Sequence, residues 1–133
     1  MGWRATPLTV QERDETGQAL VIVSFDGELD AGDPSCEDEL QSIVAAGARN
    51  VVVDMSQVCF IDSSIVRALL LTHEAVEGTG GWLRLVYTHH MVRRVIEICG
   101  LGDVLPQYSS LQSARRGVQA TAPPGDVGQE GRR

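Results

Sequence analysis

Three consecutive valines, Val51–Val53, constrain the fold more than any other stretch of the chain. An unbroken β-branched run is typical of a strand that is covered on both faces in a parallel sheet. A short loop is expected after Asp54, and Asp62-Ser63-Ser64 then introduces a long helical pattern. The stretch therefore predicts a buried strand, a loop and the start of a helix.

The predicted helix start carries two hydroxyl groups beside a carboxylate. Asp and Ser are preferred at helix N-caps, so Asp62 or Ser63 can be present simply as the cap. The free backbone N–H groups at a helix N-terminus also favour an anion such as a phosphate group. From this stretch alone, both a capping role and a functional role are open.

Length and composition predict one compact domain. The chain has 133 residues, of which 43% are apolar, enough for a hydrophobic core. Met1 to Pro7 has no signal-peptide core and no window approaches the ~20 apolar residues of a membrane span, so we expect a cytoplasmic protein with no membrane contact. We expect a flexible N-terminus over residues 1–7, the folded domain over residues 8–118, and a disordered tail, rich in Pro, Gly and polar residues, over residues 119–133.

The charge of the chain is acidic and unevenly placed. The net charge is −7, and residues 12–54 hold eleven acidic and two basic side chains, a local net charge of −9. Binding to nucleic acid is not expected, because a phosphate backbone requires a basic surface. The acidic stretch is either a solvated face or a surface for a basic partner. All eleven basic residues are Arg, which excludes a phosphate-loop lysine and Schiff-base chemistry.

Cysteines and histidines predict neither a metal site nor a cofactor. The cysteines are odd in number, lie far apart and fall in apolar patterns, so we expect buried structural thiols rather than a disulfide framework: Cys36, Cys59 and Cys99. The three histidines have no Cys or carboxylate partners at metal-ligand spacing.

Hydrophobic periodicity and turn residues predict a hairpin followed by alternating helices and strands. The expected elements after the hairpin strands 8–13 and 19–28 are a helix 34–46 capped by Asp33, the strand at Val51, a helix 64–77, a strand 82–87, a helix 89–99 capped by Thr88, a short strand Val104-Leu105, and a last helix from Ser109 or Ser110 to about Val118. Gly47 and Gly100 are expected to end their helices.

Two helices have apolar lines that predict their core faces. In helix 64–77 we expect Ile65, Leu69 and Val76 on one line and Ala68, Leu71 and Ala75 on the next. In helix 89–99 the expected core line is Met91, Val95 and Ile98, with Val92 and Ile96 beside it.

This order predicts an α/β fold with a mostly parallel central sheet, an N-terminal β-hairpin and right-handed crossovers. Ligands of such sheets gather where strands end and helices begin. The polar residues in these connections are expected at one end of the sheet: Asp30, Asp54, Asp62, Ser63 and Ser64.

Three motifs now stand in order: Gly27-Glu28-Leu29-Asp30 after the second strand, the stretch from Val51 to Ser64, and Gly100-Leu101 at the end of the third helix. With these motifs, the chain resembles STAS domains, specifically the bacterial anti-sigma factor antagonists. The resemblance covers about residues 8–117, nearly all of the expected folded part.

The resemblance implies an interaction switch that has no catalysis and no cofactor of its own. In that family the unphosphorylated antagonist binds an anti-sigma factor, which is also a serine kinase, and so frees a sigma factor. The kinase phosphorylates the antagonist and a PP2C-type phosphatase reverses the reaction. On this sequence the implied phosphoacceptor is Ser64, with Ser63 as the alternate, while Asp30 and Asp62 form an acidic docking face. A monomer or weak dimer is expected.

One departure from the family pattern follows the serines. The family commonly continues Gly-Leu-Gly, whereas this chain has Ile65-Val66-Arg67. The missing glycine can change how closely a kinase backbone approaches Ser64. Arg67, one turn from the serines, is either a partner for a phosphate and for the docked protein or a solvated helix arginine.

Two other functions compete with this hypothesis. A hydrolase using Ser63 or Ser64 is disfavoured, because the chain has no Gly-x-Ser-x-Gly motif and His89-His90 has no defined relation to the serines. A STAS accessory or sensor module that binds a nucleotide, a lipid-transport partner or a stressosome-like assembly is the remaining alternative.

Overall fold

The computed structural model describes residues 7–14 and 16–120. A five-stranded sheet has the spatial order β1-β2-β3-β4-β5 and is formed by β1 (Leu8–Arg13), β2 (Ala19–Leu29), β3 (Asn50–Ile61), β4 (Trp82–Val86) and β5 (Gln107–Tyr108). The helices are α1 (Ser35–Ala45), α2 (Ser63–Glu77), α3 (His90–Ile98) and α4 (Leu111–Arg116). Of the four described strand pairs, β1–β2 is antiparallel and the other three are parallel. The predicted α/β class, with a hairpin and then βα units, is confirmed.

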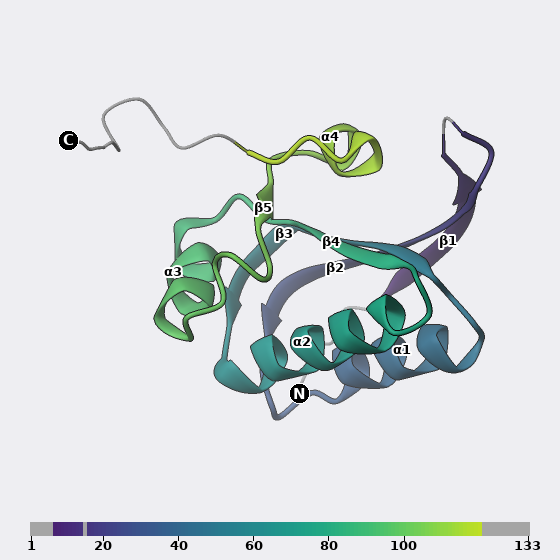
Figure 1. Cartoon of the computed structure of the whole chain (residues 1–133). Coiled ribbons are helices and arrows are strands. Elements are labelled where there is room, and N and C mark those ends of the chain that lie inside the picture. The colour runs from purple at the N-terminus through teal and green to yellow at the C-terminus, as the bar shows by residue number, and fades with distance from the viewer. Residues whose placement is uncertain (1–6, 15, 121–133) are drawn as a thin grey trace.

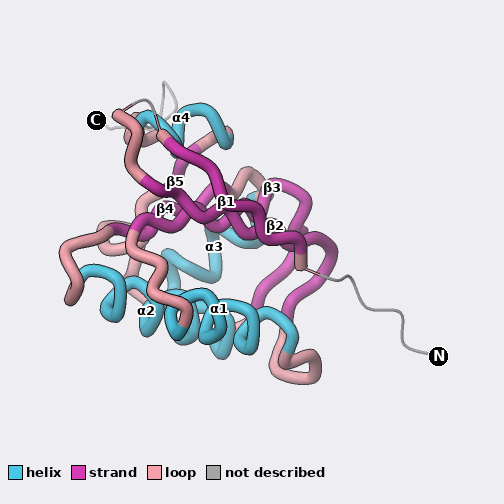
Figure 2. The backbone as a smooth tube through the Cα atoms, turned by 90° about the vertical axis from the view of Figure 1, so that its right-hand side faces the viewer, coloured by secondary structure: helices cyan, strands magenta, loops and turns pink. Residues whose placement is uncertain are grey.

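The helices lie on both sides of the sheet (Figures 1 and 2). Helices α1 and α2 lie side by side on one face and α4 lies on the other. A large core fills the space between the sheet and α1, α2 and α3, and a smaller cluster that includes Ile22, Val52 and Ala114 lies under α4. Val51–Val53 are fully buried because helices cover both faces of β3, as the valine run predicted.

Strand β3 is longer than predicted, and the expected loop after Asp54 is wrong. The strand continues to Ile61, although β4 stops pairing with it at Asp54. Beyond that point β3 pairs with β2 alone, and two register shifts interrupt the alternation of the pair. The polar residues that suggested a loop are therefore positions on a two-stranded ribbon, whose inward side chains Val58 and Ile61 stay buried.

Glycines end α1 and α3 as predicted. Gly47 has a φ of 92° and Gly100 a φ of 77°, backbone conformations that residues with a side chain rarely adopt. At α3 the N–H of Leu101 donates to the carbonyl oxygen of Ile96 at 3.1 Å, which satisfies a carbonyl of the last turn.

Two other local predictions are wrong. The cap of α3 is His89, whose Nδ1 accepts from the N–H of Met91 at 3.1 Å, and Thr88 precedes the cap. No strand forms at Val104-Leu105. Leu105 is buried in the core, and the strand begins beyond Pro106, at Gln107, because proline has no N–H to donate to a ladder.

The helix faces are shifted relative to the predicted lines. In α2, Ile65, Leu69 and Val76 are buried as expected, but Leu71 is 49% exposed and Ala75 is exposed. In α3, Val92 and Ile96 form the buried line, whereas Ile98 is 73% exposed. Each helix buries the stripe of side chains that faces the sheet, and the neighbouring apolar stripe remains exposed to solvent.

The thiols are also less buried than predicted. Cys36 is buried, and that burial, together with the carboxylates of Asp33 and Glu37, raises the pKa of its thiol to about 12. Cys59 and Cys99 are exposed, which contradicts the expectation for both. Cys59 lies on the two-stranded ribbon and Cys99 at the end of α3. Both fall in apolar stretches of the sequence, yet both face solvent.

The predicted domain boundaries lie close to the ends of the described residues. Helix α4 begins after Ser110, whose side chain and that of Ser113 form a capping box. Most of the predicted flexible segments, residues 1–7 and 119–133, lie outside the described residues. In the part of the chain that the structure describes, no helix is long and apolar enough to cross a membrane.

Candidate functional site

The candidate site lies where β2 and β3 end side by side. Leu29 and Ile61 are register partners, and the N–H of Asp62 donates to the carbonyl oxygen of Leu29 at 3.3 Å. Because β2 and β3 run parallel, the connections that follow them leave the sheet at the same end. Asp30 lies in the first connection, and Asp62 and the two serines lie in the second.

Asp62 links the start of α2 to the connection between β2 and α1. Its Oδ1 accepts from the N–H groups of Ser64 and Ile65 at 3.0 and 3.2 Å, as a helix N-cap does. Its Oδ2 accepts from the N–H of Ala31 at 3.0 Å, in the connection between β2 and α1. One carboxylate therefore caps α2 and fixes the neighbouring loop against it.

The same carboxylate carries its charge at neutral pH. Partial burial acts to raise the pKa of Asp62, but hydrogen bonds from the Ser64 hydroxyl and from the backbone N–H groups of Ala31, Ile65 and Ser64 outweigh it and hold the pKa below its usual value. A fixed negative charge consequently lies at the positive end of the α2 dipole.

The two serines have different environments. Ser64 is half-buried, and its Oγ donates to Oδ1 of Asp62 at 2.5 Å. Ser63 is the first residue of α2, is exposed, and makes no side-chain hydrogen bond to a residue that the structure describes. The Ser64 hydroxyl is thus held in one orientation by the N-cap, whereas the Ser63 hydroxyl is not.

Asp30 lies in the connection between β2 and α1, and Arg67 lies on α2 itself. Asp30 is exposed, and its Oδ1 accepts from the N–H of Gly32 at 2.9 Å. Arg67 is also exposed and forms no ion pair with any described residue. The predicted residues Asp30, Asp62, Ser63 and Ser64 are therefore brought to one end of the sheet, and Arg67 follows them by one helical turn.

Asp54 does not belong to this cluster, although the sequence placed it there. It lies in the middle of β3, where its carboxylate accepts from the N–H of Ser56 at 3.0 Å. The strand runs from Asp54 to Ile61 before it ends, a distance of roughly 20 Å at the rise of an extended strand. The unpredicted length of β3 is the reason for the error.

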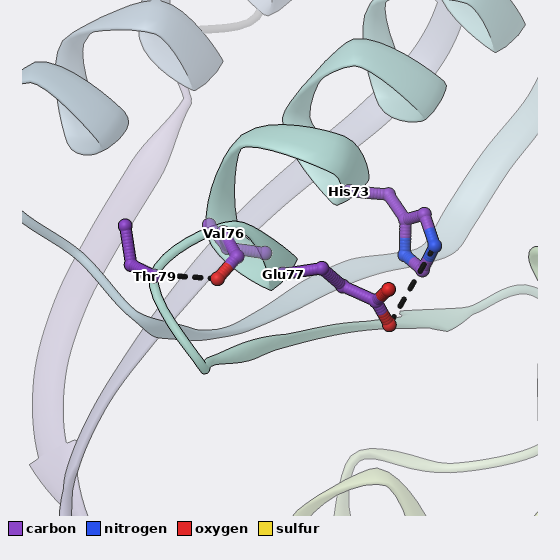
Figure 3. A network of polar contacts seen from close by, with 4 residues as sticks. All are labelled: His73, Val76, Glu77 and Thr79. Atoms are coloured by element: carbon purple, nitrogen blue, oxygen red, sulfur yellow. Dashed lines mark hydrogen bonds and ion pairs between the residues drawn. The ribbon is translucent and has the colours of Figure 1, made fainter.

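The far end of α2 carries a separate polar network (Figure 3). Nε2 of His73 lies 3.7 Å from Oε2 of Glu77, and the Thr79 hydroxyl donates to the carbonyl oxygen of Val76 at 2.8 Å. These contacts are local to the last turns of the helix. None of the side chains in this network comes from the end of α2 that bears the serines.

The hydrolase alternative requires a histidine in a defined relation to the serines. His89 and His90 stack on each other with ring centroids 4.7 Å apart, and Nδ1 of His89 is occupied as the cap of α3. Among residues 7–14 and 16–120, no group of three or more His, Cys, Asp or Glu side chains is arranged to hold a metal ion. The cluster presents a hydroxyl, carboxylates and backbone groups, which suit binding and modification.

Two hollows lie elsewhere on the described surface. One, of about 450 Å³, is lined by residues of β1 and β2 and by the end of α1, with Arg49 and Asn50 in its wall. The other, of about 240 Å³, is a groove between α1 and α2. Sequence periodicity missed this groove because it assigned Leu71 and Ala75 to the core.

Comparison with known proteins agrees with this geometry. The model of the STAS domain family matches residues 8–114. The anti-sigma-F factor antagonist RsfA of Mycobacterium tuberculosis is 31% identical over 113 residues, which cover 83% of this chain and 85% of RsfA.

Solved structures show the same architecture. A crystal structure of an anti-sigma factor antagonist from Mycobacterium paratuberculosis has a TM-score of 0.71 and 28% identity, covering 87% of this chain and 98% of the other. The anti-sigma factor antagonist SpoIIAA in its unphosphorylated form has a TM-score of 0.63 over 86% of this chain and 100% of its own. Its 21% identity supports a likeness of fold alone.

Proposed function

The chain belongs to the STAS domain family, and from this premise we propose that it is an anti-sigma factor antagonist that docks through the N-terminal end of α2. Its partner is an anti-sigma factor that is also a serine kinase, and docking frees a sigma factor. Phosphorylation of Ser64 ends the complex, and a PP2C-type phosphatase restores it. The protein acts in the cytoplasm by binding and catalyses no reaction itself.

One observation carries this proposal: Asp62 holds the Ser64 hydroxyl while it joins two connections of the fold. Because the hydroxyl hydrogen points to the carboxylate, lone pairs of Oγ are left for an incoming phosphoryl group. The carboxylate next to Oγ is also a ready acceptor for the proton that leaves. This environment favours Ser64 over Ser63 as the phosphoacceptor.

The residue that replaces the family glycine does not obstruct this face. Ile65 is 3% exposed, so its side chain lies in the core and adds no bulk beside Ser64. The exposed substitution is Arg67, which stands one turn further along α2. A kinase backbone can therefore approach Ser64 from solvent without meeting the isoleucine.

Charge repulsion explains how the phosphate switches binding off. A phosphate group adds about −1.5 to −2 charges. Two like unit charges ~6 Å apart repel by roughly 3 kcal/mol at an effective dielectric constant of ~20, before screening by salt. The helix N-terminus returns only about 0.3–1 kcal/mol at an exposed site. Phosphorylation also removes the proton that Ser64 donates to Asp62, so the docking face changes in charge and in hydrogen bonding.

Phosphosite mapping tests the proposal. The purified chain is incubated with its cognate anti-sigma factor and ATP, and the product is analysed by mass spectrometry. We expect one phosphate on Ser64, lost in Ser64→Ala and retained in the matched control Ser63→Ala. A chain that forms no complex with any anti-sigma factor of its genome and receives no phosphate on either serine contradicts the proposal.

A further inference from the structure

Helix α2 has an apolar line that its own core does not cover. Leu69 is fully buried, whereas Leu71, two residues later, is 49% exposed and Ala75 is exposed. Both face α1 across the groove of about 240 Å³, where Leu40 and Val44 of α1 lie opposite. Exposed leucines are common singly, but this leucine is the rim of an apolar groove.

The floor of the groove has no unsatisfied polar group that would hold water. Leu40 and Ala68 are buried, and the other floor residue, Thr72, donates its hydroxyl to the carbonyl oxygen of Ala68 at 2.8 Å. A partner that enters the groove consequently displaces water without breaking a hydrogen bond of the floor. Removal of weakly held water from an apolar surface favours binding.

The α1 side of the groove is acidic. Helix α1 contains three acidic residues and no basic residue, and Glu37 lines the groove directly. On α2 the exposed Glu74 precedes the lining residue Ala75 but does not itself line the groove. Neither Glu37 nor Glu74 forms an ion pair with a described residue. An apolar trough with an acidic α1 side complements an amphipathic helix that has Arg or Lys beside its apolar face.

The groove begins on α2 at Ala68, one helical turn beyond Ser64. Ser64, Ala68, Leu71 and Ala75 are spaced at i, i+4, i+7 and i+11, which places them on one line of the helix. Leu71 lies seven residues after Ser64, about 10 Å along the helix axis. A protein that contacts Ser64 can therefore reach the groove with a neighbouring segment.

We propose that the α1–α2 groove binds a basic amphipathic helix of the same anti-sigma factor that engages Ser64. This inference rests on the proposed function. A stable protein interface buries about 800 Å² on each partner and depends on a few apolar anchors. The Ser64 end supplies polar contacts that a phosphate can reverse, and Leu71 supplies the apolar anchor.

Binding of the purified cognate anti-sigma factor, measured by calorimetry, tests the groove. Leu71→Asp is expected to weaken the complex at least tenfold, since it places a carboxylate in an apolar groove that Glu37 already lines. The matched control is Leu8→Asp, because Leu8 is 63% exposed on β1 and lies outside the groove. The control is expected to bind within twofold of the unmodified chain. Circular dichroism of both variants verifies that they are folded.

A charge reversal tests the basic character of the occupant. Glu37→Arg, at the acidic residue that lines the groove, is expected to weaken binding by about threefold to tenfold, and the difference should shrink as salt is added. Asp103→Arg, in the connection between α3 and β5, is the control for the change in net charge. An unchanged affinity for both Glu37→Arg and Leu71→Asp overturns the groove as a docking site, while phosphorylation at Ser64 leaves the proposed function intact.

Cross-linking identifies the occupant. A photoreactive benzoylphenylalanine in place of Leu71 is expected to label a helical, Arg- or Lys-bearing segment of the anti-sigma factor, and the same group in place of Leu8 is not. Labelling of a second copy of this chain, or of a non-helical segment, overturns the proposal. Absence of any complex with the unmodified chain overturns both this proposal and the proposed function.

Discussion

The polar groups at the two ends of α2 are satisfied by different kinds of contact. At the C-terminal end, His73 and Glu77 and then Val76 and Thr79 pair within the last turns. At the N-terminal end, Asp62 binds two amides of its own helix and also the N–H of Ala31, 31 residues away in sequence. The first arrangement completes a helix, and the second ties two chain segments into one surface. The proposed docking site lies at the end whose polar groups are held by a long-range contact.

The largest expected difference between the ends is seen on removing the cap. Asp62→Ala leaves the first amides of α2 and the N–H of Ala31 without an acceptor, and we expect the free energy of unfolding to fall by about 2 kcal/mol. Chemical denaturation with urea measures it. The control is Asp30→Ala, whose described side-chain bond is local, and it should change stability by less than about 0.5 kcal/mol. Equal losses in the two variants would contradict the cross-loop role of Asp62.

The pH dependence of the free energy of unfolding tests the contribution of the Asp62 charge. The pKa of Asp62 is lowered in the folded chain, so its contribution to stability is present above the unfolded pKa of about 3.9 and is lost as pH falls through the folded pKa. The stability advantage of the unmodified chain over Asp62→Asn should therefore be constant near neutral pH and should shrink below about pH 4. An advantage that persists unchanged to pH 2 would show that the charge of Asp62 does not contribute.

A smaller effect is expected from the Ser64 hydroxyl. Ser64→Ala removes the donor to Asp62, and part of that loss is offset by the better helix propensity of alanine, so we expect a decrease of about 0.5–1 kcal/mol in unfolding free energy. Ser63→Ala removes no described side-chain bond and should be neutral or slightly stabilising. If Ser63→Ala is the more destabilising variant, the two hydroxyls have been assigned the wrong way round.

The smallest effect should be at the far end of α2. Glu77→Ala breaks an i,i+4 contact with His73 in which the glutamate is exposed, and such pairs contribute at most about 0.5 kcal/mol. Thermal unfolding followed by circular dichroism is sensitive enough to measure this change. It should also leave binding to the anti-sigma factor unaltered. A loss of binding in this variant would extend the docking surface to the C-terminal end of the helix.

Local chemistry explains which features could be predicted from sequence. The valine run gave a strand buried on both faces, Asp62 was one of two candidate caps, and Gly47 and Gly100 marked helix ends, because each depends on neighbours within a few residues. The bond between Asp62 and Ala31 carries no local signal and depends on β2 and β3 being adjacent.

The errors at Asp54, Leu71 and Ile98 share a tertiary cause. Asp54 was expected at the end of a strand, but pairing with β2 extends β3 beyond it. Leu71 and Ile98 were expected inside, yet both are exposed because periodicity shows that a helix is apolar without showing which stripe faces the sheet. For the same reason, sequence periodicity did not predict the groove between α1 and α2.

Binding of the cognate anti-sigma factor to Ser64→Asp and Ser64→Ala, compared by calorimetry, is the most direct test of the switch at Asp62-Ser63-Ser64. The two variants lose the same hydroxyl and differ in one negative charge beside Asp62. We predict that Ser64→Ala binds within about threefold of the unmodified chain and that Ser64→Asp binds at least tenfold more weakly, in line with the repulsion of like charges in a partly shielded site. A folded Ser64→Asp variant that binds as tightly as Ser64→Ala would contradict the account.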